Sequence, residues 1–166
     1  MALLALNATA DVAFPGGVRT MQFQELFLGP GKTSIDKQTE LIVGFSISLA
    51  KPGQASAFKR IMRPQGVALP ILNCAVWVER EGIRINASRI AVGPGGPRPF
   101  RATYAENIIS GQYFNDDNIS KATEVLLEQG SFRTSPRRAT SEYRKSILPG
   151  LFQGTFKKAW SRAAVE

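Results

Sequence analysis

The segment Gly29-Pro30-Gly31-Lys32-Thr33 is the part of the sequence that comes nearest to a phosphate-binding loop. A Walker A loop carries a further glycine five residues before its Gly-Lys-Thr, and this chain has Leu26 at that place. The residues after Thr33 are typical of a turn, whereas a Walker A loop opens a helix. We therefore interpret the segment as a tight turn and not as a site for a nucleoside triphosphate.

A second glycine-rich segment, Gly93-Pro94-Gly95-Gly96-Pro97, is of the kind that cradles phosphate through backbone N–H groups. Its two prolines have no N–H, so two of the possible donors are missing. We interpret this segment as a bent connection between a strand and a helix.

Residues 135–144 combine three arginines with one glutamate and one tyrosine in the sequence Ser-Pro-Arg-Arg-Ala-Thr-Ser-Glu-Tyr-Arg. Two interpretations stay open. The segment is either a hydrogen-bonded corner that positions the last helix, or an anion site or subunit contact.

The scarcity of histidine and cysteine excludes several kinds of chemistry. The chain has no histidine, and Cys74 is its only cysteine. No Cys/His zinc site and no iron–sulfur cluster can be built by this chain alone. A Ser-His-Asp triad and a histidine general base are excluded as well. One cysteine cannot form an internal disulfide, which favours a reducing compartment, and we predict a cytoplasmic protein.

The chain is basic, with 21 Lys and Arg against 13 Asp and Glu and a formal net charge of +8. The basic residues do not form a stripe interleaved with aromatic residues, so nucleic acid is not the expected partner. Many of them fall on the predicted last helix, where such faces are solvated or dock on an acidic partner. The apolar run of residues 1–6 is too short to span a bilayer, and we expect no membrane segment.

The first part of the chain has the pattern of short strands joined by turns. We predict a hairpin from residues 5–14 and 18–23, with Pro15-Gly16-Gly17 as its turn. Residues 23–28 favour a short helical turn, and residues 39–49 favour a buried strand. Lys51-Pro52-Gly53-Gln54 has the composition of a linker, and we place a domain boundary there.

The second part changes from strands to helices. Three strands are predicted, of which the last two form a hairpin, at residues 55–62, 69–79 and 83–92. Three helices are predicted, at residues 103–109, 119–128 and 136–163. We expect Thr103, with Glu106, to form a capping box for the first helix and Asn118 to cap the second. Pro149-Gly150 is expected to kink or break the third.

Four stretches of the sequence occur in an order that resembles a known family. The stretches are residues 23–33 with 39–42, residues 57–60, residues 89–106, and residues 138–144. Together they resemble the FAD-binding medium subunit of the molybdenum hydroxylases, which include carbon monoxide and xanthine dehydrogenases. The resemblance covers only the later part of that subunit.

The resemblance implies an α+β fold in two parts. Residues 1–50 would be the C-terminal part of an incomplete PCMH-type FAD-binding domain. Residues 54–166 would be a CO dehydrogenase flavoprotein C-terminal domain, with a three-stranded antiparallel sheet and a helical bundle.

The same resemblance implies FAD as the cofactor and two residues that contact it. Ile42 matches an aliphatic residue that packs near the isoalloxazine, and Lys59 matches a lysine that reaches the cofactor. A cation near the polar edge of a flavin favours the electron-rich reduced ring. The glycine-rich stretches that hold the pyrophosphate in the family have no counterpart here. We therefore expect the isolated chain to bind FAD weakly or not at all, and not to be catalytic.

The implied partners are a molybdenum-binding large subunit and an iron–sulfur small subunit, or a separate N-terminal flavin segment. In the family, electrons pass from molybdenum through iron–sulfur clusters to FAD, and the substrate is chosen by the molybdenum subunit. Two other functions stay open from the sequence: a cofactor-free scaffold or subunit-interaction module, and a basic nucleic-acid-binding domain.

Overall fold

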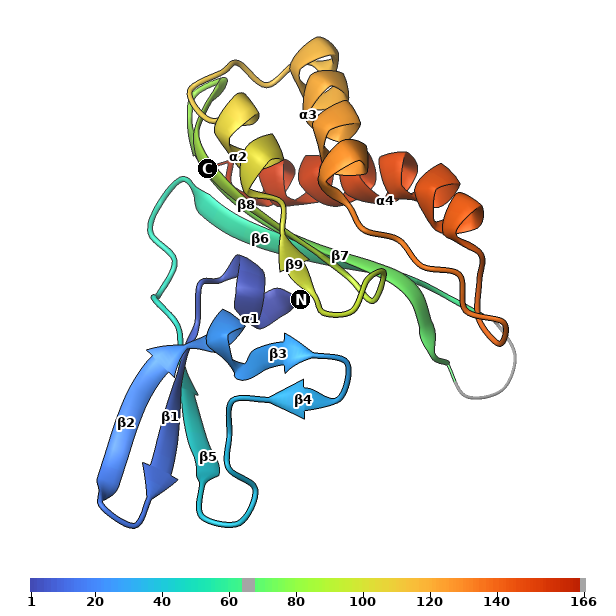
Figure 1. Cartoon of the computed structure of the whole chain (residues 1–166). Coiled ribbons are helices and arrows are strands. Elements are labelled where there is room, and N and C mark those ends of the chain that lie inside the picture. Colours follow the sequence, from blue (N-terminus) through green and yellow to red (C-terminus); the bar gives the residue numbers. More distant parts are fainter. Residues whose placement is uncertain (64–67, 165–166) are drawn as a thin grey trace.

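The computed structural model describes residues 1–63 and 68–164, and it contains two antiparallel sheets and a small hairpin (Figure 1). The first sheet has the strand order β2-β1-β5 and the second the order β6-β7-β8-β9. Three helices cover one face of the second sheet, while the N-terminal helix α1 and the first sheet lie on its other side (Figure 1).

The first sheet begins with the predicted hairpin. Its strands are β1 (Thr9–Phe14), β2 (Gly17–Gln22) and β5 (Leu41–Ser46). Strands β1 and β2 pair antiparallel, which confirms the hairpin. Residues 5–8 were predicted to extend its first strand, and that is wrong. The chain there leaves helix α1 (Ala2–Ala5), which buries Leu4 and Ala5 against Ala75 and Ala91 of the second sheet.

The segment between β2 and β5 forms a 3-10 turn and a hairpin. Its elements are η1 (Phe23–Leu26), β3 (Phe27–Gly29) and β4 (Lys32–Thr33). Gly31 at the turn has a φ of 67°, a backbone conformation that glycine adopts without strain. The next strand, β5, was predicted to be buried, but Leu41 and Val43 are 67% and 55% exposed. This is because β5 is an edge strand with one uncovered face.

The second sheet consists of β6 (Gln54–Met62), β7 (Pro70–Glu81), β8 (Arg84–Gly93) and β9 (Phe100–Arg101). Strand β7 is central and pairs with both β6 and β8, which confirms the predicted hairpin of β7 and β8. Gly82 forms the turn with a φ of 55°. The two-residue strand β9 adds a fourth strand, with Phe100 opposite Val92.

The helices that cover this sheet are α2 (Thr103–Ile109), α3 (Asp116–Gln129) and α4 (Ser141–Arg162). Their apolar faces and the facing side of the sheet form the main core. Its largest fully buried side chains include Leu72, Ile90, Ile109, Leu126, Phe152 and Phe156. None of the helices in the described part of the chain is long and apolar enough to cross a membrane.

The starts of the first two predicted helices differ from the structure. Thr103 is already helical and Ala102 holds the N-cap position, so the predicted capping box is wrong. The Glu106 carboxylate instead accepts a hydrogen bond of 2.7 Å from the backbone N–H of Ile90 in the sheet. Helix α3 begins before residue 119, because Asn115, and not Asn118, is its cap.

The last helix is shorter than predicted, and it is continuous. Residues 135–139 form a turn closed by a hydrogen bond of 2.9 Å from the Ser135 N–H to the Ala139 carbonyl, so α4 begins only at Ser141. The sequence predicted a kink or a break at Pro149-Gly150. The break is wrong, since the helix continues to Arg162, and the kink stays a prediction. The carbonyl that Pro149 leaves without a donor belongs to the exposed Lys145, where water can replace the lost partner.

Candidate functional site

Lys59 lies on β6, the edge strand of the second sheet. Its neighbours two residues away on the same face, Ala57 and Ile61, pack into the core beneath α4. A Cβ atom placed on Gly154 of α4 would lie 2.6 Å from the Lys59 Nζ, so the glycine makes room for this ammonium group. Lys59 is exposed and takes part in none of the ion pairs of residues 1–63 and 68–164. It is therefore a cation at the rim of the sheet.

Ile42 lies on β5 of the first sheet, opposite Val12 of β1. Val12 is fully buried and Ile42 half-buried, so Ile42 offers aliphatic surface at the border of this small core. A bulge between Asp11 and Val12 shifts the register of β1 and β5 at this point. Ile42 and Lys59 belong to different sheets (Figure 1), and the structure does not join them through a hydrogen bond or a shared core cluster.

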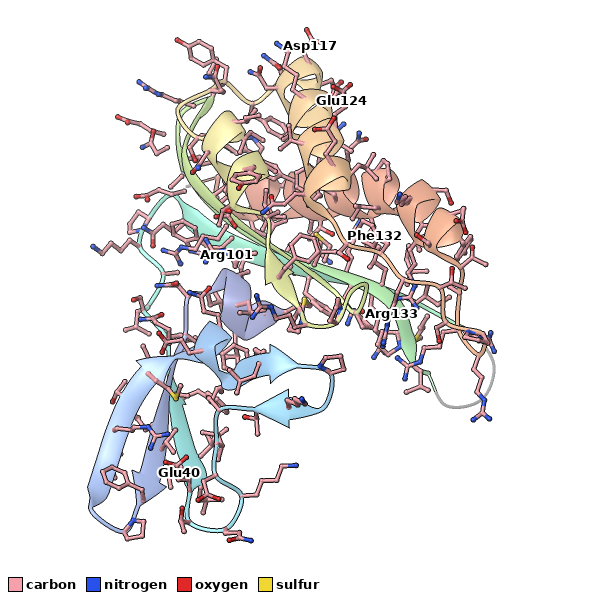
Figure 2. All side chains as sticks on the ribbon, in the orientation of Figure 1. Glu40, Arg101, Asp117, Glu124, Phe132 and Arg133 are labelled. Carbon is pink, nitrogen blue, oxygen red and sulfur yellow. The ribbon has the colours of Figure 1, made fainter. Side chains whose placement is uncertain are left out.

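The glycine-rich segment at residues 93–97 is filled by the chain itself. A Cβ atom on Gly95 would lie 2.9 Å from the ring of Phe132, and one on Gly96 would lie 2.7 Å from the carbonyl oxygen of Ser131. Figure 2 shows Phe132 on the segment that leads from α3 to α4. The close packing of Phe132 and Ser131 against Gly95 and Gly96 supports the interpretation as a bent connection.

The segment at residues 29–33 is the turn of the β3–β4 hairpin. Bends and turns follow Thr33, and no helix begins there. The interpretation as a tight turn is confirmed, and a Walker A loop is excluded.

A cleft of about 500 Å³ lies where the first part of the chain meets β9. It is lined by residues of η1, β3 and the stretch around β9, among them Glu25, Phe27, Arg98, Phe100 and Arg101. Glu25 accepts a hydrogen bond of 3.0 Å from the Gln22 N–H, and Arg101 is paired with Glu106. The cleft thus combines apolar walls with charged side chains that are already engaged inside the chain.

The titratable groups give no sign of acid–base or metal chemistry in the described residues. Cys74 is fully buried, and burial raises the pKa of its thiol to about 12. Residues 1–63 and 68–164 contain no group of three or more metal-binding side chains that could hold an ion. What the chain offers chemically is a free ammonium, an aliphatic surface and several arginines.

The segment at residues 135–144 does form a hydrogen-bonded corner. Arg144 Nη1 donates a hydrogen bond of 2.5 Å to the carbonyl oxygen of Pro94, and Ser141 Oγ donates one of 2.9 Å to that of Phe132. Burial, and then the charges of Arg133 and Arg138, lower the pKa of Arg144. Sequence patterns signalled the corner but not the burial of Arg144, because its acceptor lies 50 residues away.

Comparison with known proteins places most of the chain in one family. The family described as CO dehydrogenase flavoprotein C-terminal domain matches residues 56–159. The chain is 27% identical over 156 residues to the glyceraldehyde dehydrogenase medium chain of Sulfolobus acidocaldarius, covering 94% of this chain and 54% of that protein. It is 29% identical over 163 residues to the nicotine 6-hydroxylase medium subunit of Paenarthrobacter nicotinovorans, with 98% and 56% covered.

A xanthine dehydrogenase FAD-binding subunit of Escherichia coli O157:H7 is 26% identical over 162 residues, with 96% of this chain and 54% of that protein covered. The chain spans about half the length of the curated relatives it matches.

Solved structures show the same fold. The carbon monoxide dehydrogenase of Hydrogenophaga pseudoflava matches with a TM-score of 0.89 at 22% identity, covering 97% of this chain and 55% of that chain. The quinoline 2-oxidoreductase of Pseudomonas putida 86 matches with a TM-score of 0.84 at 24% identity, over 97% and 55%. These matches confirm the predicted α+β fold.

Proposed function

Since the chain belongs to the family of CO dehydrogenase flavoprotein C-terminal domains, we propose that it is the later part of the FAD-binding, electron-transferring subunit of a molybdenum hydroxylase. The family match over residues 56–159 is the observation that carries this proposal. The names of the relatives agree with it, because two are medium chains or subunits and one is an FAD-binding subunit. We assign residues 1–50 to the end of an FAD-binding domain and residues 54–166 to the C-terminal domain.

The chain offers part of a flavin site. The exposed ammonium of Lys59 suits the polar edge of the ring, and the half-buried side chain of Ile42 suits its apolar surface. Pro94 and Pro97 deprive the turn at residues 93–97 of two N–H donors, so we propose that other polypeptide holds the pyrophosphate. FAD, when bound, supplies the acceptance and release of electrons. Lys59 lies on the side of the second sheet that faces α4, and Ile42 belongs to the first sheet on the other side, so the two contacts are separate proposals. Lys59 would stabilise negative charge on a ring at the edge of β6, whereas Ile42 would exclude water from one side of a ring at the first sheet.

An uncovered apolar surface on the first sheet supports the idea of further polypeptide. Val18, Leu41 and Val43 are 63%, 67% and 55% exposed. Val18 and Leu41 both lie opposite Ala13 of the central strand, so they share one face of the sheet. A face of this kind is usually covered by another chain or segment. We propose an N-terminal flavin segment as its cover, and a molybdenum-binding large subunit and an iron–sulfur small subunit as further partners, all in the cytoplasm.

The test is reconstitution with the missing half of the subunit. The chain is co-expressed with the N-terminal half of the glyceraldehyde dehydrogenase medium chain as a second polypeptide, and the purified complex is desalted. We expect a flavin absorption band at near-stoichiometric level in the complex and a colourless preparation of the chain alone. A stable complex without flavin would contradict the proposal and favour a cofactor-free scaffold.

A further inference from the structure

Arg144 is a buried cation without a carboxylate partner in the described residues. It is 2% exposed, and its one hydrogen bond from the side chain goes to the backbone carbonyl of Pro94. Its Nε is buried and has no hydrogen-bond partner among residues 1–63 and 68–164. Buried charges in proteins are normally paired, because removing a charge from water is costly. The unpaired Nε is therefore a hydrogen-bond donor that the described residues leave unused.

Two more arginines belong to segments that lie next to Arg144 in the fold. Arg133 belongs to the segment between α3 and α4 (Figure 2). Its backbone N–H donates a hydrogen bond of 3.0 Å to the carbonyl oxygen of Gly95, the residue after Pro94. Arg138 belongs to the turn before α4, where its backbone N–H donates a hydrogen bond of 3.0 Å to the carbonyl oxygen of Ser135. Both charges act on Arg144, since they lower its pKa in addition to burial. We call Arg133, Arg138 and Arg144 the arginine corner.

The surroundings of the arginine corner do not compensate its charge. The ion pairs of the described residues join Arg19 to Glu40, Arg101 to Glu106 and Lys157 to Asp116, and none involves the corner. Glu142 is the one acidic residue between positions 130 and 164, and it is exposed. The corner also lies at the start of α4, whose N-terminus carries the positive end of the helix dipole.

We propose that the arginine corner is a binding site for a phosphoryl group, either free phosphate or pyrophosphate or the phosphates of a nucleotide. Guanidinium groups present paired donors that match phosphate oxygens, and a compact, multiply charged oxyanion neutralises several cations at one place. The site does not include Ile42 or Lys59, so it does not depend on the proposed flavin contacts. A carboxylate of a partner protein is also negatively charged, but one carboxylate carries less negative charge than one phosphoryl group.

The test uses the 166-residue chain labelled with ¹⁵N. Pyrophosphate is titrated against sodium chloride at matched ionic strength, and the Nε–Hε signal of Arg144 and the amide signal of Arg138 are followed by NMR. We expect saturable shifts of these signals with pyrophosphate and no saturable shift with chloride. Arg138→Gln should weaken binding about tenfold or more, the typical value of a lost contact to a charged group. Arg138 is half-exposed, so this variant should stay folded.

Lys145→Gln is the matched control, because it removes an exposed charge from the same turn of α4 without touching the corner. Its affinity for pyrophosphate should equal that of the wild type. Tighter binding of ADP than of pyrophosphate would identify a nucleotide as the source of the phosphates, and equal binding would identify the phosphoryl group alone. The proposal is overturned if the shifts do not saturate, if Arg138→Gln binds as well as Lys145→Gln, or if an acidic peptide saturates the site and pyrophosphate does not.

Discussion

Arg101 donates two hydrogen bonds of 2.6 Å, from Nε and Nη2, to the two carboxylate oxygens of Glu106. The same carboxylate accepts the N–H of Ile90, so one buried side chain fastens α2 and β9 to β8. Glu106 is only 6% exposed, and Arg101 is labelled in Figure 2 at the junction of the sheet with the helices. The pair therefore holds the helical layer in place.

Glu106→Gln should destabilise the chain by about 2–4 kcal/mol. The amide keeps the shape of the carboxylate but removes the charge that Arg101 faces, and breaking one partner of a buried pair is costly. Urea unfolding followed by circular dichroism measures the difference. Lys157→Gln, which removes the exposed partner of Asp116, should cost less than about 1 kcal/mol. Equal effects of the two substitutions would contradict the structural role of Glu106.

Gly95→Ala should destabilise the chain by about 1–3 kcal/mol, because its new Cβ would lie 2.9 Å from the ring of Phe132. Phe132→Leu removes that ring, so Gly95→Ala should lower the free energy of unfolding by less in a chain that already carries Phe132→Leu. The measurement is a double-mutant cycle of unfolding free energies. If the two substitutions lower the free energy of unfolding in a strictly additive way, the alanine Cβ and the Phe132 ring do not clash.

Cys74 should resist thiol reagents at pH 8 in the folded chain and react at once in denaturant, since its pKa is raised to about 12 by burial. In the unfolded chain the thiol loses its proton near the ordinary value of 9.0, whereas the folded chain keeps it. The unfolded state then binds fewer protons, so this group lowers the free energy of unfolding as pH rises from about 9 to about 12. The contribution of the thiol is isolated by comparing the pH dependence of the unfolding free energy between the wild type and Cys74→Ala. Rapid labelling of the folded chain would contradict the burial of the thiol.

The second sheet could be predicted from the sequence because its strands carry their own signals. Strand β7 is apolar on both faces, as a central strand is, and Gly82 marks the turn to β8. The exposure of β5 could not be predicted in the same way. Its Leu41 and Val43 suit burial, but whether a sheet face is covered depends on polypeptide beyond the strand itself.

The candidate site could be predicted only in part. Family stretches pointed to Ile42 and Lys59, and these assignments stay predictions, whereas the room that Gly154 gives to Lys59 depends on how α4 packs on β6. The start of α4 was misplaced because a hydrogen bond between Ser135 and Ala139 competes with the helix, and local propensity does not report such a turn.

Lys59→Met should weaken FAD binding to the reconstituted subunit or lower the reduction potential of the flavin. Methionine keeps roughly the length of lysine and removes the charge. A hydrogen bond to a charged group contributes about 1.5–3 kcal/mol, which corresponds to a loss of affinity of about tenfold to hundredfold. If the ammonium acts on the reduced ring, its loss destabilises the negative charge there and the potential falls.

The measurements are a fluorescence titration with FAD and a spectroscopic redox titration of the complex of the chain with the N-terminal half. The fold should survive, because Lys59 is exposed and has no ion pair in the described residues. Lys121→Met is the matched control, since Lys121 is an exposed lysine of α3, away from β6. If Lys59→Met and Lys121→Met bind FAD with wild-type affinity and potential, Lys59 is a surface lysine and does not reach the cofactor. A loss confined to Lys59→Met would place its ammonium at the flavin ring.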